Sequence, residues 1–256
     1  MKVSEYAPGV PCWVDLGSPD VEASKAFYSA LFGWTPQPSP PESGGYTIFH
    51  KGDDPVAAVG PLQGDGQPPS WSWYATTRDA DEVAGKVESA GGKVVVAPFD
   101  VLDAGRIAVF LDTSGAAFSI WQPRNFPGAR AVTEPGAFTW NELMTRDPDA
   151  ATEFYGRVLG WTPKVNANPD MPYTEFQVEG RTIAGMMPMI GDAWPADLPD
   201  HWMVYFGVED CDASAEKIKS LGGTVSVPPT DAPGIGRFAV VGDPIGAFFS
   251  IIALAR

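Results

Sequence analysis

The chain carries the same segment twice, and this internal repeat limits what it can fold into more than any other feature. One copy begins at Gly9 with G-V-P-C-W-V-D-L, and the other begins at Gly136 with G-A-F-T-W-N-E-L. The residue pairs that align between the copies include Trp13 with Trp140, Trp34 with Trp161, Tyr46 with Tyr173, Trp71 with Trp202, Tyr74 with Tyr205, and Asp112 with Asp243. A repeat of this length predicts two domains with one architecture.

The length of the chain agrees with this division. Its 256 residues suffice for two ordinary domains, and 44% hydrophobic residues are enough for a packed core in each. A proline-rich stretch from Pro123 to Pro135 is typical of a linker. We therefore expect a first domain over residues 8–124 and a second domain over residues 134–254.

Each copy consists of two successive units in which a strand-length apolar segment is followed by a helix and then by more strands. In the first copy Asp20 can cap the start of the first helix, and Gly33 can end it. Asp147 and Gly160 hold the equivalent positions in the second copy. The pattern predicts an α+β fold in which two βαβββ units per domain form a curved sheet around a cup, a natural site for a small molecule.

The charge of the chain excludes some classes of partner. The net charge is −15, from 32 acidic and 17 basic residues, and no basic patch is visible, which argues against nucleic acid and against an anionic membrane. The sequence has no apolar run of membrane-spanning length and no apolar signal core at its start. These features predict a cytoplasmic monomer or homodimer whose partner is a small molecule. No dinucleotide fingerprint or phosphate-binding loop occurs, and no cofactor is expected.

Two motifs occur in both copies: F-Y-x-x-x-x-G-W after the first helix and D-x-x-G-A-x-x-S-I near the end. With these motifs the chain resembles the vicinal oxygen chelate superfamily, which includes glyoxalase I, extradiol dioxygenases, fosfomycin-resistance enzymes and bleomycin-binding proteins. It is similar to the tandem glyoxalase-like proteins of actinobacteria, some of which are described as secreted mycobacterial antigens or as accessory proteins of anthracycline biosynthesis. The resemblance implies the tandem cupped fold, but it does not imply one reaction, because the superfamily supports many.

The same resemblance implies three metal-ligand positions in an enzymatic domain: a His in the first strand, a His or Gln in the first strand of the second unit, and a Glu in the last strand. The residues at or near these positions in the two copies are Trp13 and Trp140, then Ser72-Trp73 and Met203, then Ser119 and Ser250. None of these residues supplies the imidazole or carboxylate that a divalent ion requires, so we expect no metal in either cup. A metal site of another kind, built on His201 and nearby acids, is the alternative.

One carboxylate per copy shares a strand face with the tryptophan at the first metal position. Residues two apart on a strand point the same way, so Asp15 accompanies Trp13, and Glu142 accompanies Trp140. A carboxylate beside an indole in a dry cleft has a raised pKa and can act as a general acid or base. The alternative is a structural role, in which each acid pairs with an arginine or caps the backbone at a sheet edge.

Further candidates for ligand binding also come mostly in pairs. Arg106 and Arg237 can clamp an anionic ligand, although a salt bridge within the domain is the favoured interpretation. Aromatic side chains on strands beside the cups would stack on a flat ligand; these are Trp13, Trp140, Trp71, Trp202, Tyr74 and Tyr205. Met203 and His201 occur in the second copy alone, so the two cups should differ in shape. Ser119 and Ser250 complete the candidate set.

Two functions fit these observations. The first is a metal-free protein that binds a hydrophobic or aromatic metabolite in its cup, and it accounts for the lost metal ligands and the many aromatic residues. The second is a metal-independent enzyme of secondary metabolism, such as an isomerase, lyase, cyclase or accessory oxidation enzyme, with Asp15 or Glu142 as its acid/base group. A structural module without a ligand is a third possibility. We favour binding, with catalysis close behind.

Overall fold

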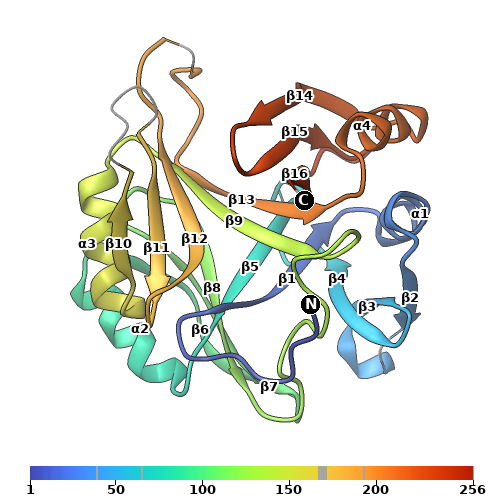
Figure 1. Ribbon diagram of the computed structural model, residues 1–256. Helices are drawn as coiled ribbons and strands as arrows, with labels where there is room; N and C mark the ends of the chain where they lie inside the picture. The colour runs from blue at the N-terminus through green and yellow to red at the C-terminus, as the bar shows by residue number, and fades with distance from the viewer. Residues whose placement is uncertain (39, 65, 167–171, 193, 256) are drawn as a thin grey trace.

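The computed structural model describes residues 1–256 except 39, 65, 167–171, 193 and 256, and each repeat forms one eight-stranded sheet with two helices (Figure 1). The first repeat comprises β1 (Pro11–Ser18), α1 (Val21–Phe32), β2 (Thr35–Pro38), the short 3-10 helix η1 (Pro41–Ser43), β3 (Thr47–Lys51), β4 (Asp54–Pro61), β5 (Ser70–Thr76), α2 (Ala80–Ser89), β6 (Lys93–Val101), β7 (Gly105–Leu111) and β8 (Ala117–Pro123). The second comprises β9 (Phe138–Thr145), α3 (Pro148–Leu159), β10 (Thr162–Val165), β11 (Thr174–Val178), β12 (Arg181–Pro188), β13 (His201–Gly207), α4 (Cys211–Ser220), β14 (Thr224–Ala232), β15 (Gly236–Gly242) and β16 (Phe248–Leu254). The α+β tandem fold predicted from the sequence is confirmed.

Both sheets have the same topology. The strand order is β2-β3-β4-β1-β5-β8-β7-β6 in the first sheet and β10-β11-β12-β9-β13-β16-β15-β14 in the second. Each sheet is therefore two βαβββ units, which meet where β1 pairs antiparallel with β5, or β9 with β13. None of the helices in the described part of the chain is long and apolar enough to cross a membrane.

The first helix of each repeat begins and ends at the capping residues that the sequence indicates. The Asp20 side chain accepts a hydrogen bond from the backbone N–H of Ala23, and Gly33 follows α1 in the left-handed conformation, with φ of 72°. Asp147 and Gly160 perform the same two tasks for α3. The first helix therefore begins and ends at equivalent residues in the two repeats. The tryptophan that follows each helix is placed equivalently as a result.

The strand register divides each central strand between two faces of its sheet. Trp13 lies opposite Tyr74, and Asp15 lies opposite Ser72, so these side chains share one face. Trp140 and Glu142 share the equivalent face of the second sheet with Tyr205 and Met203. We call these two surfaces the first and second cup faces, and the opposite surfaces the inner faces.

The two inner faces pack against each other and form one aromatic core. Trp73 lies with its ring centroid 4.6 Å from that of Trp202, and Trp71 lies 4.8 Å from Phe206. Since Trp71 and Trp202 are buried here, the expectation that they border the cups does not match their position. Residues three apart on a strand point in opposite directions, so Trp71 faces inward while Tyr74 faces the cup.

Two equivalent hydrogen-bond chains cross between the domains within this core. Trp71 Nε1 donates to the Tyr28 hydroxyl at 3.0 Å, and Tyr28 donates to Asp243 of the other repeat at 2.9 Å. The second chain runs through Trp202, Tyr155 and Asp112, with distances of 2.8 and 2.9 Å. The tyrosine of the F-Y motif in each repeat therefore binds the aspartate that begins the D-x-x-G-A motif in the other repeat.

The tryptophan of the F-Y-x-x-x-x-G-W motif makes a further reciprocal contact. Trp34 Nε1 donates to the backbone carbonyl of Gly136 at 2.8 Å, and Trp161 Nε1 donates to that of Gly9 at 2.8 Å. Each bond ties the end of one repeat's first helix to the start of the other repeat. The two motifs therefore join the domains. Because the inner faces pack against each other, the cup faces point away from each other.

Candidate functional site

The first cup face has a carboxylate held by two tyrosines. Asp15 Oδ2 accepts hydrogen bonds from the Tyr46 hydroxyl at 3.0 Å and from the Tyr74 hydroxyl at 2.9 Å. Trp13 Nε1 donates to the Tyr46 hydroxyl at 2.9 Å. The result is a hydrogen-bond network in which an indole N–H donates to one phenol, and two phenols donate to the same carboxylate oxygen.

The second cup face repeats this arrangement with a longer acid. Glu142 Oε1 accepts from Tyr173 at 2.7 Å, Glu142 Oε2 accepts from Tyr205 at 2.6 Å, and Trp140 Nε1 donates to the Tyr173 hydroxyl at 3.1 Å. Sequence reasoning placed the acid, the tryptophan and Tyr205 together but did not include Tyr173 or Tyr46 in the site. The available signal was that both tyrosines align between the repeats.

The two sites differ by one carbon at each of two positions: the acid of the second site is one carbon longer, and the residue beside it is one carbon shorter. In the first sheet Asp15 lies beside Ala58, and in the second Glu142 lies beside Gly185. A Cβ on Gly185 would collide with the Tyr173 hydroxyl, so the methyl that Ala58 carries is excluded from the second site. The longer acid and the missing methyl therefore occur together, and the two cups present their carboxylates differently.

Burial controls the protonation of both acids. Removal from water raises the pKa of Asp15 to about 6, although the hydrogen bonds from Tyr74 and Tyr46 partly oppose this rise. Burial likewise raises the pKa of Glu142, with Tyr205 and Tyr173 opposing it. The pKa values of Tyr74 and Tyr205 lie well above their usual range because of burial and the adjacent carboxylate, so both phenols stay neutral donors.

The raised pKa of Asp15 predicts a pH-dependent stability. A carboxyl whose pKa is higher in the folded state binds more protons there, so the free energy of unfolding should fall as pH rises from the ordinary value of 3.8 to about 6. The loss attributable to Asp15 is at most about 3 kcal/mol. Asp15→Asn should remove this component, so the stability of the variant relative to the original chain should increase over that interval and stay constant above it.

Urea denaturation at a series of pH values measures the difference. The matched control is Asp53→Asn, because Asp53 is an exposed turn residue. If the curves for Asp15→Asn and the original chain run parallel from pH 4 to pH 7, the raised pKa of Asp15 is refuted.

Arg106 and Arg237 lie away from the cups. Arg106 binds Asp81, at the start of α2, through two bonds of 3.0 Å, and it also binds Asp100. Arg237 binds Asp212, at the start of α4, in the same way. Both guanidinium groups are engaged on the helix-covered side of their sheets, so the salt bridge favoured from the sequence describes their position and the ligand clamp does not.

The remaining candidates lie on or beside the cup faces. Ser119 lies next to Tyr74, and Ser250 lies next to Tyr205, each on a neighbouring parallel strand. Met203 lies opposite Glu142, and His201 occupies the first position of β13, where its Nδ1 is 2.8 Å from the Pro199 carbonyl. His201 is therefore already engaged by the backbone two residues before it.

The donors at the family's metal positions do not fit a divalent ion. The indole nitrogens of Trp13 and Trp140 are N–H donors to tyrosines and offer no lone pair. Ser119 and Ser250 are neutral hydroxyls in place of a carboxylate. Among the residues that the structure describes, no three His, Cys, Asp or Glu side chains are grouped so that they could hold a metal.

The two cups are covered by different segments. In the second, Trp140 packs with Trp194 and Leu198 against a methionine-rich cluster made of Met144, Met189, Met203, Tyr205 and Ile252. In the first, Phe126 of the interdomain linker lies against Trp13, with ring centroids 4.9 Å apart. Trp13 is 5% exposed, whereas Trp140 is half-buried, so the second tryptophan is the more accessible one.

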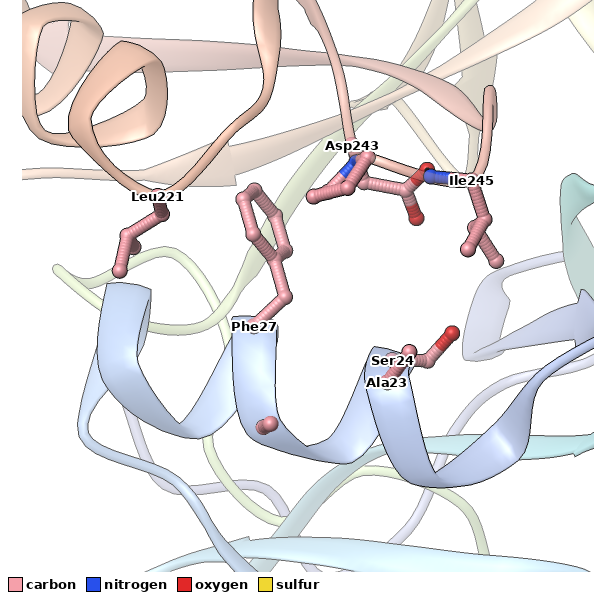
Figure 2. Close-up of a pocket in the computed structure, with 8 residues that line it drawn as sticks. Ala23, Ser24, Phe27, Leu221, Asp243 and Ile245 are labelled. Atoms are coloured by element: carbon pink, nitrogen blue, oxygen red, sulfur yellow. The ribbon is translucent and has the colours of Figure 1, made fainter.

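Two hollows lie elsewhere in the structure. One of about 320 Å³ separates α1 from the turn between β15 and β16, where Phe27, Leu221 and Ile245 form its apolar walls (Figure 2). Its polar groups already have hydrogen-bond partners: Asp243 accepts a bond from the Tyr28 hydroxyl, and the Ser24 hydroxyl pairs with that of Ser18. The second, of about 270 Å³, adjoins the linker near Thr133 and Glu209. Neither hollow includes the carboxylate sites.

Comparison with known proteins identifies relatives along almost the entire chain. A family model described as the Glyoxalase/Bleomycin resistance protein/Dioxygenase superfamily matches residues 12–120 and 137–251. CFP32 of Mycobacterium tuberculosis is 40% identical, with 98% of this chain and 97% of that protein covered. The anthracycline biosynthesis protein DnrV of Streptomyces peucetius is also 40% identical, with 98% of this chain and 96% of that protein covered.

Solved structures share the fold at low sequence identity. The Mn(II)-bound glyoxalase from Novosphingobium aromaticivorans matches with a TM-score of 0.67 and 18% identity, over 96% of this chain and 82% of that one. The 2,3-dioxygenase LapB from Pseudomonas sp. KL28 matches with a TM-score of 0.66 and 12% identity, over 98% of this chain and 94% of that one. At these identities the likeness extends to the fold alone.

Proposed function

Because this chain belongs to the glyoxalase/bleomycin resistance protein/dioxygenase superfamily, we propose that it binds an aromatic small molecule on its second cup face without the family's metal. The observation that carries this proposal is the arrangement of Trp140, Tyr205 and Glu142, which lie together at the base of an apolar surface. A half-buried indole offers a stacking partner for a flat ring. The carboxylate offers a strong acceptor for a ligand hydroxyl.

The donor chemistry favours a metal-free site. At the positions where the family places metal ligands, the chain has indoles and hydroxyls, and these groups are suited to contact an organic molecule. The flexible side chains of Met144, Met189 and Met203 can adapt to ligands of different outline.

The relatives favour a hydroxylated, fused-ring ligand. DnrV is by its name a protein of anthracycline biosynthesis. Anthracyclines as a chemical class have a planar aromatic ring system with phenolic hydroxyls. Such a molecule matches a site that combines an indole face, methionines and a buried carboxylate. We therefore take aromatic metabolites of this kind as the ligand class.

Proton transfer is the second candidate function. It is favoured by the raised pKa of Glu142, because a carboxyl acts as an acid or base most efficiently when its pKa is close to the working pH. In this mechanism Glu142 takes a proton from a hydroxyl or an acidic C–H of the ligand, while Tyr173 and Tyr205 stabilise the charge distribution through their hydrogen bonds. A metal-independent isomerase or lyase would use the site in this way.

The charge of Glu142 distinguishes these functions. Glu142→Gln keeps the shape of the side chain but removes a charged acceptor, which contributes about 1.5–3 kcal/mol. The dissociation constant of 1,8-dihydroxyanthraquinone, measured by isothermal titration calorimetry after dialysis against EDTA, should therefore rise about 10- to 100-fold. Asp15→Asn is the matched control in the other cup and should leave the constant unchanged.

The outcomes separate the proposals. Loss of turnover of a related hydroxyaromatic substrate by Glu142→Gln, with binding retained, would establish the enzymatic function. Weaker binding without turnover by the original chain supports the binding function. An original chain that binds the anthraquinone only after a divalent metal is added would refute the metal-free site.

A further inference from the structure

The interdomain linker delivers an aromatic ring to the first cup face. Phe126 meets Trp13 edge to face, with centroids 4.9 Å apart and an angle of 88°, and it meets Trp121 at 6.2 Å and 77°. Trp121 shares the cup face with Ser119 and Tyr74, as the register of β8 against β5 requires. The ring therefore packs on the first cup face at Trp13, whose side chain shares that face with Asp15.

Hydrogen bonds hold this segment in place from both sides. Trp121 Nε1 donates to the carbonyl of Phe126 at 2.7 Å, and the backbone N–H of Phe126 donates to Ala104 at 3.1 Å. Three residues later the N–H of Ala129 donates to the Cys12 carbonyl at 2.8 Å. A Cβ on the intervening Gly128, whose φ is 115°, would collide with that carbonyl, so a glycine is required for the linker to lie on β1.

The two cups therefore differ in what fills them. Trp13, beneath Phe126, is 5% exposed, whereas its equivalent Trp140 is half-buried. The residue equivalent to Trp121 is Ile252, which belongs to the methionine-rich cluster. The first site thus contains the Phe126 ring, whose backbone carbonyl is bound by Trp121. The second site has flexible methionine and isoleucine side chains instead.

We propose that the first cup is an aromatic-ring site filled by the chain's own Phe126, and that the second cup alone is left for a ligand from solution. The first half of this proposal is independent of the proposed function, and the second half rests on it. The linker ring contacts both Trp13 and Trp121, so a free aromatic compound must replace Phe126 to stack on Trp13 in the first cup. The vacated site would accept one uncharged ring of the size of phenol.

Removal of the ring tests the first half. Phe126→Ala should lower the melting temperature and create a site for phenol, because apolar cavities bind small aromatic molecules. A saturating concentration of phenol should then raise the melting temperature of Phe126→Ala by roughly 5 °C more than it raises that of the original chain. Phe126→Leu keeps the space largely filled and is the matched control, with no such gain. Adding Trp13→Leu to Phe126→Ala should abolish the gain.

Each outcome decides the proposal. If phenol stabilises Phe126→Ala no more than the original chain, or stabilises Phe126→Leu equally, the first cup is not an aromatic site. If Phe126→Ala does not fold, Phe126→Val vacates the ring position with a smaller loss and is measured in the same way. An original chain that binds two equivalents of 1,8-dihydroxyanthraquinone would overturn the second half, whereas a chain that binds none while Phe126→Ala gains phenol would overturn only the proposed function.

Discussion

Asp112→Ala should lower the free energy of unfolding by about 3–5 kcal/mol, because it removes a buried carboxylate that accepts several hydrogen bonds. The Asp112 carboxylate accepts bonds from the backbone N–H groups of Ser114 and Ala116 and from the Tyr155 hydroxyl of the other domain. Its removal opens the turn before β8 and leaves the hydroxyl buried without an acceptor. Since Trp202 donates to the same hydroxyl, the loss should extend into the second domain.

Chemical denaturation followed by tryptophan fluorescence measures the effect. Asp243→Ala, at the equivalent position, should cost a similar amount through Tyr28. Asp81→Ala is the control, because Asp81 and Arg106 form a solvent-exposed ion pair, and such pairs contribute little to stability. Two separate transitions in the original chain, with only one shifted by Asp112→Ala, would contradict the reciprocal coupling of the domains.

Trp73→Ala should also cost about 3–5 kcal/mol, because it leaves a large cavity between the domains. Trp73 is 1% exposed, and its ring lies 5.8 Å from that of Trp161 and 4.6 Å from that of Trp202. The midpoint of urea unfolding measures the loss. At the equivalent position in the second repeat, Val204→Ala removes only two carbons and should cost about 2 kcal/mol.

A second variant separates volume from hydrogen bonding at this position. Trp73 Nε1 is buried without a hydrogen-bond partner among the described residues. Trp73→Phe removes that donor together with part of the ring, so it should cost less than half as much as Trp73→Ala. If the two substitutions lower the free energy of unfolding equally, the interpretation of the Trp73 indole nitrogen as an unsatisfied donor is wrong.

The fold could be predicted because the sequence motifs and helix caps that specify it occur in both repeats and involve residues close in sequence. The F-Y-x-x-x-x-G-W motif occurs in both copies, and the caps at Asp20 and Gly33 give the same helix limits that the structure has. The placement of Asp15 beside Trp13 also followed from strand alternation. These features depend on residues close in sequence, so no knowledge of distant contacts was required.

The candidate site was predicted less completely, since its composition depends on which strands become neighbours. Trp71 and Tyr74 were both assigned to the cup, although three-residue spacing on one strand already excludes a common face. The partner of Arg106 is Asp81, on a helix 25 residues away in sequence, and strand patterns contain no information about that pair. The position of Phe126 was not predicted because a linker has no periodicity from which a face can be inferred.

The reciprocal Tyr–Asp bonds also bear on how a duplicated gene of this kind can diverge. Since each half completes the interior of the other, selection for a folded product retains both halves, including one whose outward surface has lost its own ligand. Mutations on the two outward surfaces are then free to accumulate separately. If Phe126 fills the first site as proposed, the first half can persist as a structural support while the outward surface of the second half diverges.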